Sequence, residues 1–532
     1  MEGLLGGDNL RAYREAVRRL SKTKGFKPEK RPLLEDAFGF LTSSDRPFLI
    51  LNAPTGYGIT LLSFALALHS LKDASVFDRV IHVLPLRSII EDIQRTAEEA
   101  FGFSRTKMMG SSGEFMHLFP LNVTTADTFT WDLLKLNTKR MHFVKARMEF
   151  GYDYLTQASI LTSLIVFDEA HFLLEDRSMA TAFDAVVEFL ASQGVPIVVM
   201  TATLPEGHVQ FLKRYAMKNG YDFKILAPEG NDPFVKRESG KDISIEVQRG
   251  DPLNFINFVE PGKRNAIIVN SVRRAVEIYD MAISNATVGF DRERVILIHG
   301  RMIPSHKKDL INRLRRMKEE FLLIGTQAVE AGVDFSVDVM ITEGAPVNSL
   351  LQRFGRLARW PNDRSGKAIV LEDTSPAPYP SEKVKQTLDL LRKENIHPRV
   401  PSTYSSLVSE VHGRSIISVK KLINQSLKGE LFKLMKDPSK RAPEVLERVE
   451  SLVARGVPII RGFLIPLSVE NETLPVSLGK FSELYSKGLI RIIAETPLKE
   501  PLDGYSIAKK VAMGEKIEIV YTGKYDWERG MA

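Results

Sequence analysis

Residues 48–71 read FLILNAPTGYGITLLSFALALHSL and contain the strongest indication of the fold class. It begins with a short apolar run, turns at two glycines, and continues as an apolar helix pattern. Strand, glycine-rich turn and helix in this order are typical of a phosphate-binding loop, because backbone N–H groups at the helix N-terminus face the phosphates. Gly56 and Gly58 let the backbone approach a ligand closely, and the Thr60 hydroxyl is suited to hold Mg²⁺. A glycine turn before a helix is often only a turn, so the loop needs support from elsewhere in the chain.

The residue before the threonine departs from the phosphate-loop pattern. It is Ile59, where such loops carry a lysine that reaches the β- and γ-phosphates. Isoleucine cannot donate a hydrogen bond, so the loss should cost about 2–4 kcal/mol in the transition state of hydrolysis. Nucleotide binding is expected to survive better than hydrolysis, because the loop N–H groups and Mg²⁺ remain.

Length and composition describe a water-soluble chain of several domains. At 532 residues the chain is too long for one hydrophobic core. A net charge of +7 suits a polyanion partner and an ordinary solvated surface equally well. The absence of cysteine excludes disulfides and thiolate metal sites. No apolar run approaches the roughly 18 residues of a membrane span, and the N-terminus lacks a signal-peptide pattern, so we expect no membrane association and a cytoplasmic location.

Short apolar runs recur along the chain, each followed by a polar turn and a helical pattern. Runs of this kind predict buried parallel strands in βα units. One set is FLIL (48–51), VIHVLP (80–85), LIVF (164–167) and IVVMT (197–201); the other is AIIVN (266–270), VILIH (295–299), FLLIGT (321–326), VMIT (339–342) and AIVLE (368–372). A polar stretch at residues 230–242 separates the two sets, which predicts two tandem α/β domains.

The C-terminal region has a different pattern. Proline-rich TSPAPYPSEK (374–383) is typical of a linker, and helical patterns at 381–395 and 416–455 follow it. Strand-like runs then come in IIRGFLIPLSV (459–469) and KIEIVYTG (516–523). The expected organisation is an N-terminal leader (1–30), a first α/β domain (31–228), a second (229–375), and linker helices with a mixed accessory domain (376–532).

Two further motifs in the first domain support the interpretation of residues 53–60 as a phosphate-binding loop. In VFDEAH, Asp168 and Glu169 end a buried strand, where paired carboxylates can bind Mg²⁺ and orient or deprotonate an attacking water. An acidic loop that caps the next helix would have the same composition. The TAT of Thr201–Thr203 follows a strand of valines, as ordinary threonines at a strand end also do.

The second domain supplies a matching pair of motifs. GTQAVEAGVD spans 325–334 and LLQRFGRLAR spans 350–359. In the latter, Arg353, Arg356 and Arg359 recur every three residues, which places them broadly on one helical face. Such a cluster is usually solvated or salt-bridged. An arginine that reaches a γ-phosphate is worth roughly 10³–10⁵ in rate, so the cluster is also a candidate for that role.

Taken together and in this order, the motifs resemble the motor core of superfamily 2 helicases. Longer sequence stretches around these motifs resemble the helicase of type I CRISPR interference. They are VLPLRSIIEDIQ (83–94), VTTADTFTWDLL (123–134) and above all TQAVEAGVDFSVDVMITEGAPVNSLLQRFGRLAR (326–359). The resemblance covers roughly residues 30–375 and implies two RecA-like domains that bind ATP and Mg²⁺.

The resemblance also implies a role for each matching residue. Implied nucleotide contacts are Gly56, Tyr57, Gly58, Ile59, Thr60, Asp334 and Arg353, with Thr60 and Asp168 holding Mg²⁺. Implied catalytic and coupling residues are Asp168, Glu169, His171, Thr201, Thr203, Arg356 and Arg359. Implied contacts to the DNA backbone are Arg87, Thr124, Asn270 and Thr326.

Many members of that family carry a histidine–aspartate (HD) nuclease before the motor. In this chain none of the ten histidines is followed directly by aspartate. The expected protein is therefore a stand-alone helicase subunit of the split archaeal type. It would be recruited to an RNA-guided type I surveillance complex and move along single-stranded DNA of the displaced target strand. It would thereby unwind the target for a separate HD nuclease subunit.

Ile59 leaves alternatives open. The chain could be a weakened variant or a natural subunit without ATPase activity. Alternatively, its loop could be one that never bound nucleotide. The presence of DEAH, TAT and the three arginines favours a recent or engineered change at position 59. The alternative functions are a non-hydrolysing DNA clamp that gates the nuclease, and a superfamily 2 RNA or repair helicase.

Overall fold

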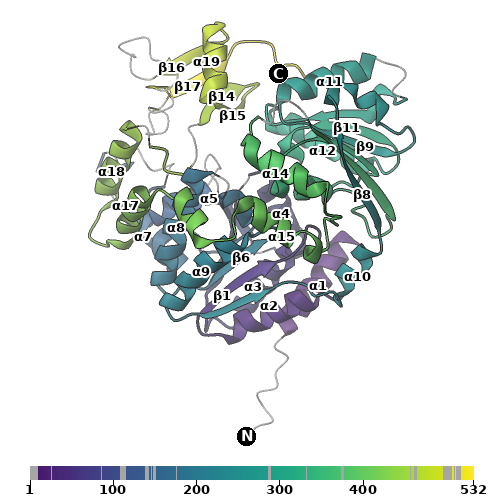
Figure 1. The fold of residues 1–532 in the computed structure, drawn as a ribbon. Helices are drawn as coiled ribbons and strands as arrows, with labels where there is room; N and C mark the ends of the chain where they lie inside the picture. The colour runs from purple at the N-terminus through teal and green to yellow at the C-terminus, as the bar shows by residue number, and fades with distance from the viewer. Residues whose placement is uncertain are drawn as a thin grey trace. The chain divides into compact units, whose positions relative to one another are not determined.

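The protein is described by a computed structural model. It describes residues 10–531 apart from 26, 86, 103, 108–115, 138–142, 145, 148–150, 175, 285–288, 331, 373–376, 456, 461–463, 495–505, 508, 509 and 511–516. The chain divides into two compact units, each assembled from two stretches of sequence. The first unit is Met1–Lys236 with Gly413–Arg461, and the second is Arg237–His412 with Gly462–Ala532 (Figure 1). Among the described residues, no helix combines the length and the apolar character that crossing a bilayer requires.

A seven-stranded parallel sheet forms the centre of the first unit. Its spatial order is β3 (Ser104–Lys107), β4 (Leu121–Thr125), β2 (Arg79–Leu84), β5 (Ser163–Phe167), β6 (Ile197–Thr201), β1 (Pro47–Asn52) and β7 (Asp222–Leu226). Five of these strands are buried along almost their whole length, which explains their continuous apolar sequences. The carboxyl ends of β1, β5 and β6 meet at one edge of this sheet, and the phosphate loop, DEAH and TAT follow them.

Helices surround this sheet. They are α1 (Arg11–Lys24), α2 (Pro32–Ser43), α3 (Thr60–Ser70), α4 (Arg87–Ala100), α5 (Ala126–Leu133), α7 (Tyr152–Leu161), α8 (Arg177–Ser192) and α9 (Glu206–Lys218). The helix after the phosphate loop, α3, is buried along most of its length; it packs against β2 and is covered by α1 and α2. This double burial explains why α3 is apolar all round rather than amphipathic.

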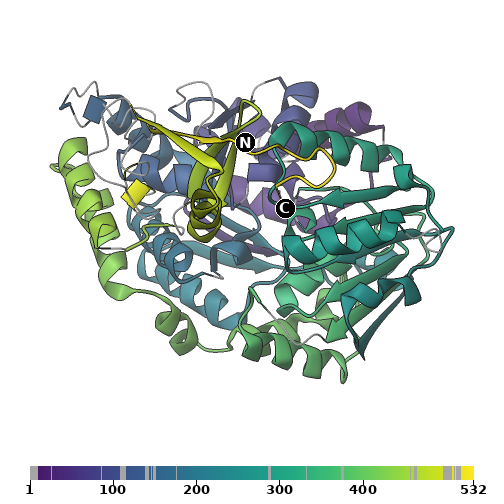
Figure 2. The same ribbon diagram turned by 90° about the horizontal axis from the view of Figure 1, so that it is seen from above.

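The second unit is built on a six-stranded parallel sheet. Its spatial order is β10 (Val295–Ile298), β11 (Phe321–Gly325), β9 (Arg264–Ile268), β12 (Val339–Glu343), β13 (Ser365–Glu372) and β8 (Asp242–Arg249). Along β11, Phe321 and Leu323 enter one hydrophobic core and Leu322 and Ile324 enter another. Both faces of the sheet are therefore covered, as the layers of helices in Figure 2 show.

Different helices supply the two cores of the second unit. One core contains residues of α13 (Val347–Phe354), α14 (Ser381–Leu391) and α15 (Ser405–His412). The other contains residues of α11 (Val272–Ser284), and α12 (Pro304–Arg316) lies beside β10. The short α10 (Pro233–Ser239) lies where the first unit passes into the second.

A third sheet of four strands belongs to the second unit. Its order is β15 (Glu472–Ser477), β14 (Leu464–Val469), β17 (Ile517–Tyr521) and β16 (Ile490–Ala494), with parallel and antiparallel pairs. This sheet shares a core with α19 (Leu478–Ser486) and with Ile303 (Figure 1). The predicted fold class, two parallel α/β sheets followed by a mixed region, is confirmed.

Residues 376–532, expected as linker helices and one accessory domain, are divided between the two units. The helices α16 (Ile416–Leu422), α17 (Gln425–Lys436) and α18 (Ala442–Ala454) belong to the first unit. Lys428 of α17 lies 2.9 Å from Asp184 and 2.8 Å from Glu188 of α8, and Nζ donates to the Tyr215 hydroxyl at 2.6 Å. A nearly buried cation with three partners therefore fixes α17 on α8.

Several strands were not among the apolar runs that predicted the sheets. The edge strands β7 and β8 have mostly exposed or half-buried side chains, so their sequences, DFKIL and DISIEVQR, carry charges. An edge strand exposes one side to water, and the apolar pattern on which the prediction depended is then weak. The buried strand β4 was missed because its sequence, LNVTT, is rich in polar residues.

Candidate functional site

The phosphate-loop candidate joins the end of β1 to the start of α3. Gly56 and Gly58 have φ values of 86° and 89°, a left-handed conformation that favours glycine at both positions. The Ala53 N–H donates to the Thr201 carbonyl at 3.0 Å, so the loop starts against the end of β6. The turn that the sequence predicted therefore lies beside the TAT motif.

The N-terminus of α3 has the donors that an anion needs. Ile59 is the N-cap residue and provides no side-chain hydrogen bond. Within the part of the chain that the structure describes, the backbone N–H groups of Gly58, Ile59 and Thr60 have no acceptor. Unpaired N–H groups at the positive end of a helix form a binding site for phosphate. These residues fit a bound nucleotide phosphate, whereas the branched apolar side chain of Ile59 adds no charge to it.

The sequence predicted a nucleotide contact for Tyr57, and the structure places its side chain inside the first unit. Tyr57 is 1% exposed, and its hydroxyl donates to Asp232 Oδ2 at 2.6 Å. Burial and this carboxylate raise the pKa of Tyr57. The ring lies 5.1 Å from that of Phe234, and the Arg31 Nε donates to the Tyr57 carbonyl at 3.0 Å. Tyr57 therefore anchors the loop.

The DEAH carboxylates come directly after β5. Asp168 is 4% exposed, and its Oδ1 accepts the Glu169 N–H at 2.8 Å. Its Oδ2 is hydrogen-bonded at 3.2 Å to Nε2 of His82, whose Nδ1 is hydrogen-bonded to the Ser63 hydroxyl at 2.8 Å. The chain Ser63–His82–Asp168 links α3, β2 and β5 and fixes the orientation of the Asp168 carboxylate. Glu169 has φ of 49°, a strained conformation for a non-glycine residue, which is typical of functional sites.

DEAH and TAT are in direct contact. His171 Nδ1 lies 3.0 Å from the Thr201 hydroxyl, which also accepts the Thr203 N–H at 3.2 Å. Burial lowers the pKa of His171 to about 3, so the imidazole is neutral at pH 7. A neutral ring does not form an ion pair with Glu169, whose carboxylate lies 3.5 Å from the same nitrogen. The two motifs that the sequence expected to act together are therefore joined by one hydrogen bond.

In the second unit, Arg353 lies in the interior rather than at the surface. It is 0% exposed and donates to Glu330 Oε1 at 2.8 Å, Thr342 Oγ1 at 2.7 Å and Asn270 Oδ1 at 3.0 Å. The Tyr379 hydroxyl accepts a further, longer bond at 3.4 Å. The sequence predicted a nucleotide contact for this arginine, but the structure uses its donors within the second unit.

The other two arginines of this motif differ in exposure. Arg356 is 7% exposed, donates to the Glu330 carbonyl at 2.6 Å and lies over the Phe335 ring. Arg359 donates from Nε to Asp334 Oδ1 at 2.8 Å, with side-chain exposures of 18% and 52%. Asp334 and Arg359 therefore lie together, as two neighbouring site residues would.

The four predicted DNA contacts are placed unequally. The Thr124 side chain is 0% exposed, and its hydroxyl has no partner among the described residues. Asn270 is 7% exposed and donates to the Gly344 carbonyl at 2.9 Å, and Thr326 is 3% exposed. Arg87 begins α4, and its side chain lies outside the described residues.

Sequence reasoning missed the residues that hold the motifs in place. His82 is a lone histidine in an apolar strand, and only its spatial partners show what it does. Glu330 lies inside the TQAVEAGVD motif, and its carboxylate is the buried partner of Arg353. Asp232 lies 175 residues from Tyr57, and no local pattern marks that separation.

Comparison with known proteins identifies two helicase regions in this chain. Residues 39–211 match the DEAD/DEAH box helicase family, and residues 261–362 match the family described as CRISPR-associated nuclease/helicase Cas3, C-terminal. The chain is 27% identical over 363 residues to the CRISPR-associated helicase Cas3 of Thermoproteus tenax. That match covers 65% of this chain and 59% of the relative, so this chain spans less than two thirds of the relative's length.

Solved structures share the fold. The crystal structure of T. fusca Cas3-ADP matches with a TM-score of 0.57 and 18% identity, over 80% of this chain and 57% of that one. A chain of a CRISPR RNA-guided surveillance complex, pre-nicking, matches with a TM-score of 0.52 and 17% identity, over 80% and 56%. The resemblance to the helicase of CRISPR interference, stated from the motifs, is confirmed: the chain has a DEAD/DEAH box helicase domain, a Cas3-like C-terminal helicase domain and a RecA-like fold.

Proposed function

We propose that this chain is the ATP-dependent DNA helicase motor of a CRISPR interference system. The observation that carries the proposal is the hydrogen bond between His171 and Thr201, beside the phosphate loop at the same edge of the sheet. This contact joins the segment with the paired carboxylates to the segment that touches the loop. Such a connection lets the state of a bound nucleotide alter the position of neighbouring elements.

The residues present fit ATP with Mg²⁺. The N–H groups of Gly58, Ile59 and Thr60 would bind phosphate oxygens, and Thr60 with Asp168 would hold the metal. A bound Mg²⁺ would neutralise charge that develops on the phosphates. Glu169 would orient or deprotonate the attacking water.

Residues of both units would complete this chemistry. His171, Thr201 and Thr203 would couple the nucleotide to motion. In the second unit, Asp334 would lie near the ribose and the attacking water, and Arg356 and Arg359 would contact the γ-phosphate. Arg353 would position these side chains from the interior.

Hydrolysis would be weakened by Ile59. No cation stands at that position, and the loss of a charge-assisted donor costs about 2–4 kcal/mol, or roughly 30- to 1,000-fold in rate. A nearby cation, Arg31, is already engaged: its Nε donates to the Tyr57 carbonyl, its guanidinium lies over the Tyr57 and Phe234 rings, and it pairs with Glu29. Arg31 is therefore a poor substitute for the missing lysine.

The substrate of the motor would be single-stranded DNA of the displaced target strand. The chain would be recruited to an RNA-guided surveillance complex, since a chain of one such complex shares its fold. A separate HD nuclease subunit would then cut the unwound strand, in the split archaeal arrangement. Contacts to the DNA backbone would come from Arg87, Thr124, Asn270 and Thr326, the four positions that the resemblance implies.

The test is ATP hydrolysis by this chain and by an Ile59→Lys variant, each with and without single-stranded DNA. The expected result is DNA-stimulated turnover in the lysine form, at least 30-fold faster than in the parent. A matched control, Ile59→Lys with Glu169→Gln, keeps the new charge and removes the proposed general base, so it should stay inactive. The proposal fails if the lysine form binds DNA but never hydrolyses ATP.

A second function, a non-hydrolysing DNA clamp that gates the nuclease, is favoured by Ile59 itself. The loop keeps its N–H donors and lacks the cation, which suits binding without turnover. Equal interference activity of the parent and the lysine variant in cells would favour the clamp. Higher activity of the lysine variant would favour the motor.

A further inference from the structure

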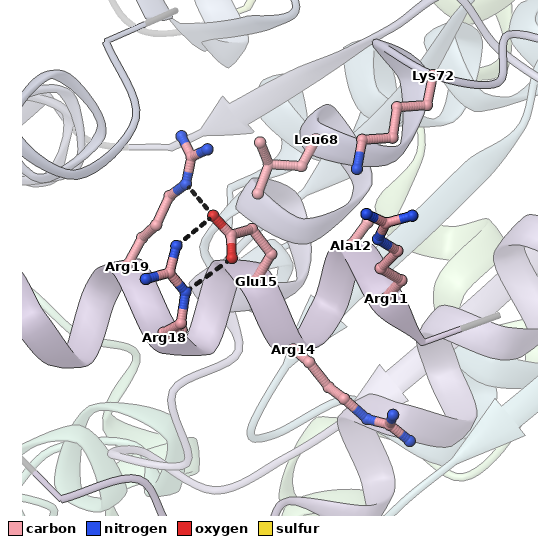
Figure 3. Close-up of a pocket in the computed structure, with 8 residues that line it drawn as sticks. All are labelled: Arg11, Ala12, Arg14, Glu15, Arg18, Arg19, Leu68 and Lys72. Atoms are coloured by element: carbon pink, nitrogen blue, oxygen red, sulfur yellow. Dashed lines mark hydrogen bonds and ion pairs between the residues drawn. The ribbon is translucent and has the colours of Figure 1, made fainter. Parts of the chain in front are cut away.

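A hollow between α1 and the C-terminal end of α3 is lined mainly by cations. Its volume is about 460 Å³, and its lining residues are Arg11, Ala12, Arg14, Glu15, Arg18, Arg19, Leu68 and Lys72. Five of these eight side chains are positively charged and one is a carboxylate. Figure 3 shows them on α1 and near the end of α3, both in the first unit.

The helix that presents these cations is fixed in the unit rather than loosely attached. Ala12, Tyr13 and Ala16 of α1 are buried, and the Tyr13 ring lies 6.0 Å from that of Phe38 in α2. The apolar residues of α1 therefore pack inward, whereas Arg11, Arg14 and Arg18 are exposed. Exposed side chains on a packed helix keep a defined spacing, which a flexible tail does not.

A single carboxylate organises two of the arginines. Glu15 accepts hydrogen bonds from Arg18 Nε at 2.8 Å and Nη2 at 2.9 Å, and from Arg19 Nε at 2.7 Å. The dashed lines in Figure 3 mark these contacts. A guanidinium has five N–H donors, so both arginines keep donors for a ligand after they bind Glu15.

Two further cations of the hollow, one on α1 and one just beyond α3, lack an anionic partner in the part of the chain that the structure describes. Among the described residues, the side chains of Arg11 and Lys72 have no carboxylate partner. The neighbouring helix α4 carries exposed Glu98 and Glu99, but neither lines the hollow. The hollow thus has an excess of positive charge at a site that water reaches.

The hollow lies away from the nucleotide site. The phosphate-loop end of α3 is at Thr60, whereas Leu68 and Lys72 lie at or just beyond its other end. At 1.5 Å per residue, the eight residues from Thr60 to Leu68 correspond to about 12 Å along the helix axis. The cations therefore have no part in holding ATP at the loop.

We propose that this hollow binds the phosphodiester backbone of a nucleic-acid strand. Four of its five cations are arginines, whose planar donors match phosphate oxygens. From Arg11 to Arg19 the helix rises about 12 Å, which equals three to four nucleotides at about 3.4 Å each. The hollow contributes a contact that needs no nucleotide cofactor and lies outside the motor motifs.

The lining also argues against a protein partner. Protein interfaces depend on a dry apolar core with aromatic anchors. The apolar lining residues here are Ala12 and Leu68, both already buried, and no aromatic side chain is among the described residues that line the hollow. Polar, strongly positive surfaces without such anchors are typical of contacts with nucleic-acid phosphates.

The first test maps the contact on the unmodified protein. Lysines are acetylated with and without a 30-nucleotide single-stranded DNA, in the absence of ATP, and quantified by mass spectrometry. DNA should slow acetylation of Lys72 several-fold and leave Lys218, an exposed lysine of α9, unchanged. Equal rates at Lys72 with and without DNA overturn the proposal. Protection of Lys72 by polyglutamate but not by DNA also overturns it, in favour of an acidic protein segment.

The second test measures affinity against salt concentration. The double variant Arg11→Gln/Lys72→Gln should reduce the slope of log K against log[salt] by about 1.4, at about 0.7 per single-strand phosphate contact. Relative to 1 M salt, where the affinities converge, this corresponds to about 25-fold weaker binding at 0.1 M salt. The control Lys213→Gln/Lys218→Gln removes two exposed lysines of α9 and should change neither value. Equal slopes in the two variants refute the site. Failure of ATP hydrolysis in the lysine-restored chain would refute the motor and leave these readouts intact.

Discussion

The buried pair of Arg353 and Glu330 gives the sharpest test of how the second unit is held together. The change is Arg353→Met, which keeps a long apolar side chain and removes every donor. Arg353 and Glu330 are 0% and 2% exposed, and 2.8 Å separates the guanidinium Nε from the carboxylate Oε1. Thr342 and Asn270 lose their donor in the same substitution.

The expected cost is about 3–5 kcal/mol in the free energy of unfolding of the second unit, because one charge of a buried pair is left uncompensated. Burial already raises the pKa of Glu330 and Arg353 opposes that shift, so without the arginine the carboxyl takes up a proton more easily. Protonation of Glu330 therefore limits the destabilisation to about 3–5 kcal/mol. This range includes the lost hydrogen bonds to Thr342 and Asn270, which are worth about 1 kcal/mol each.

Hydrogen exchange of the β12 amides, Val339–Glu343, measures this free energy inside the second unit. The matched control is Glu330→Met/Arg353→Met, which removes both charges and should recover at least 2 kcal/mol of the loss. If Arg353→Met leaves exchange unchanged but abolishes ADP binding, the reasoning is wrong. The arginine would then serve the nucleotide, as the sequence suggested.

Three further perturbations have defined outcomes. Tyr57→Phe removes the donor to Asp232, worth about 1.5–3 kcal/mol, so calorimetry should show weaker ADP binding; unchanged affinity would contradict the anchoring role. His299 has a pKa lowered by burial to about 4, below the unfolded value of about 6.5, so stability falls as the pH drops between these values. The free energy of unfolding should fall by about 2 kcal/mol between pH 7 and pH 5 because of this group. In His299→Gln, the difference between the free energies measured by urea unfolding at the two pH values should be smaller by that amount. Lys428→Met leaves Asp184 without its cation at a cost of about 3–5 kcal/mol, so α17 should be proteolysed faster; a parental cleavage rate would show that other contacts hold this segment.

Local sequence determined most of the sheets and the order of the motifs. Buried parallel strands are apolar on both faces, so nine of the predicted runs coincide with observed strands. A phosphate loop needs glycine at positive φ, which fixes Gly56 and Gly58 in the sequence itself. The order of DEAH, TAT and the arginine motif was enough to show the resemblance to a helicase core, because each motif is a short continuous stretch of the chain.

Which of these side chains are committed to partners inside the protein is visible only in the folded structure. Tyr57 and Arg353 lie within motifs, yet their partners, Asp232 and Glu330, are separated from them by 175 and 23 residues. The same holds for Lys428, whose ion pair with Asp184 assigns a C-terminal segment to the first unit. A sequence pattern reports the period and polarity of neighbouring residues. Burial and pairing depend instead on segments that meet only when the chain folds, and no local pattern contains that information.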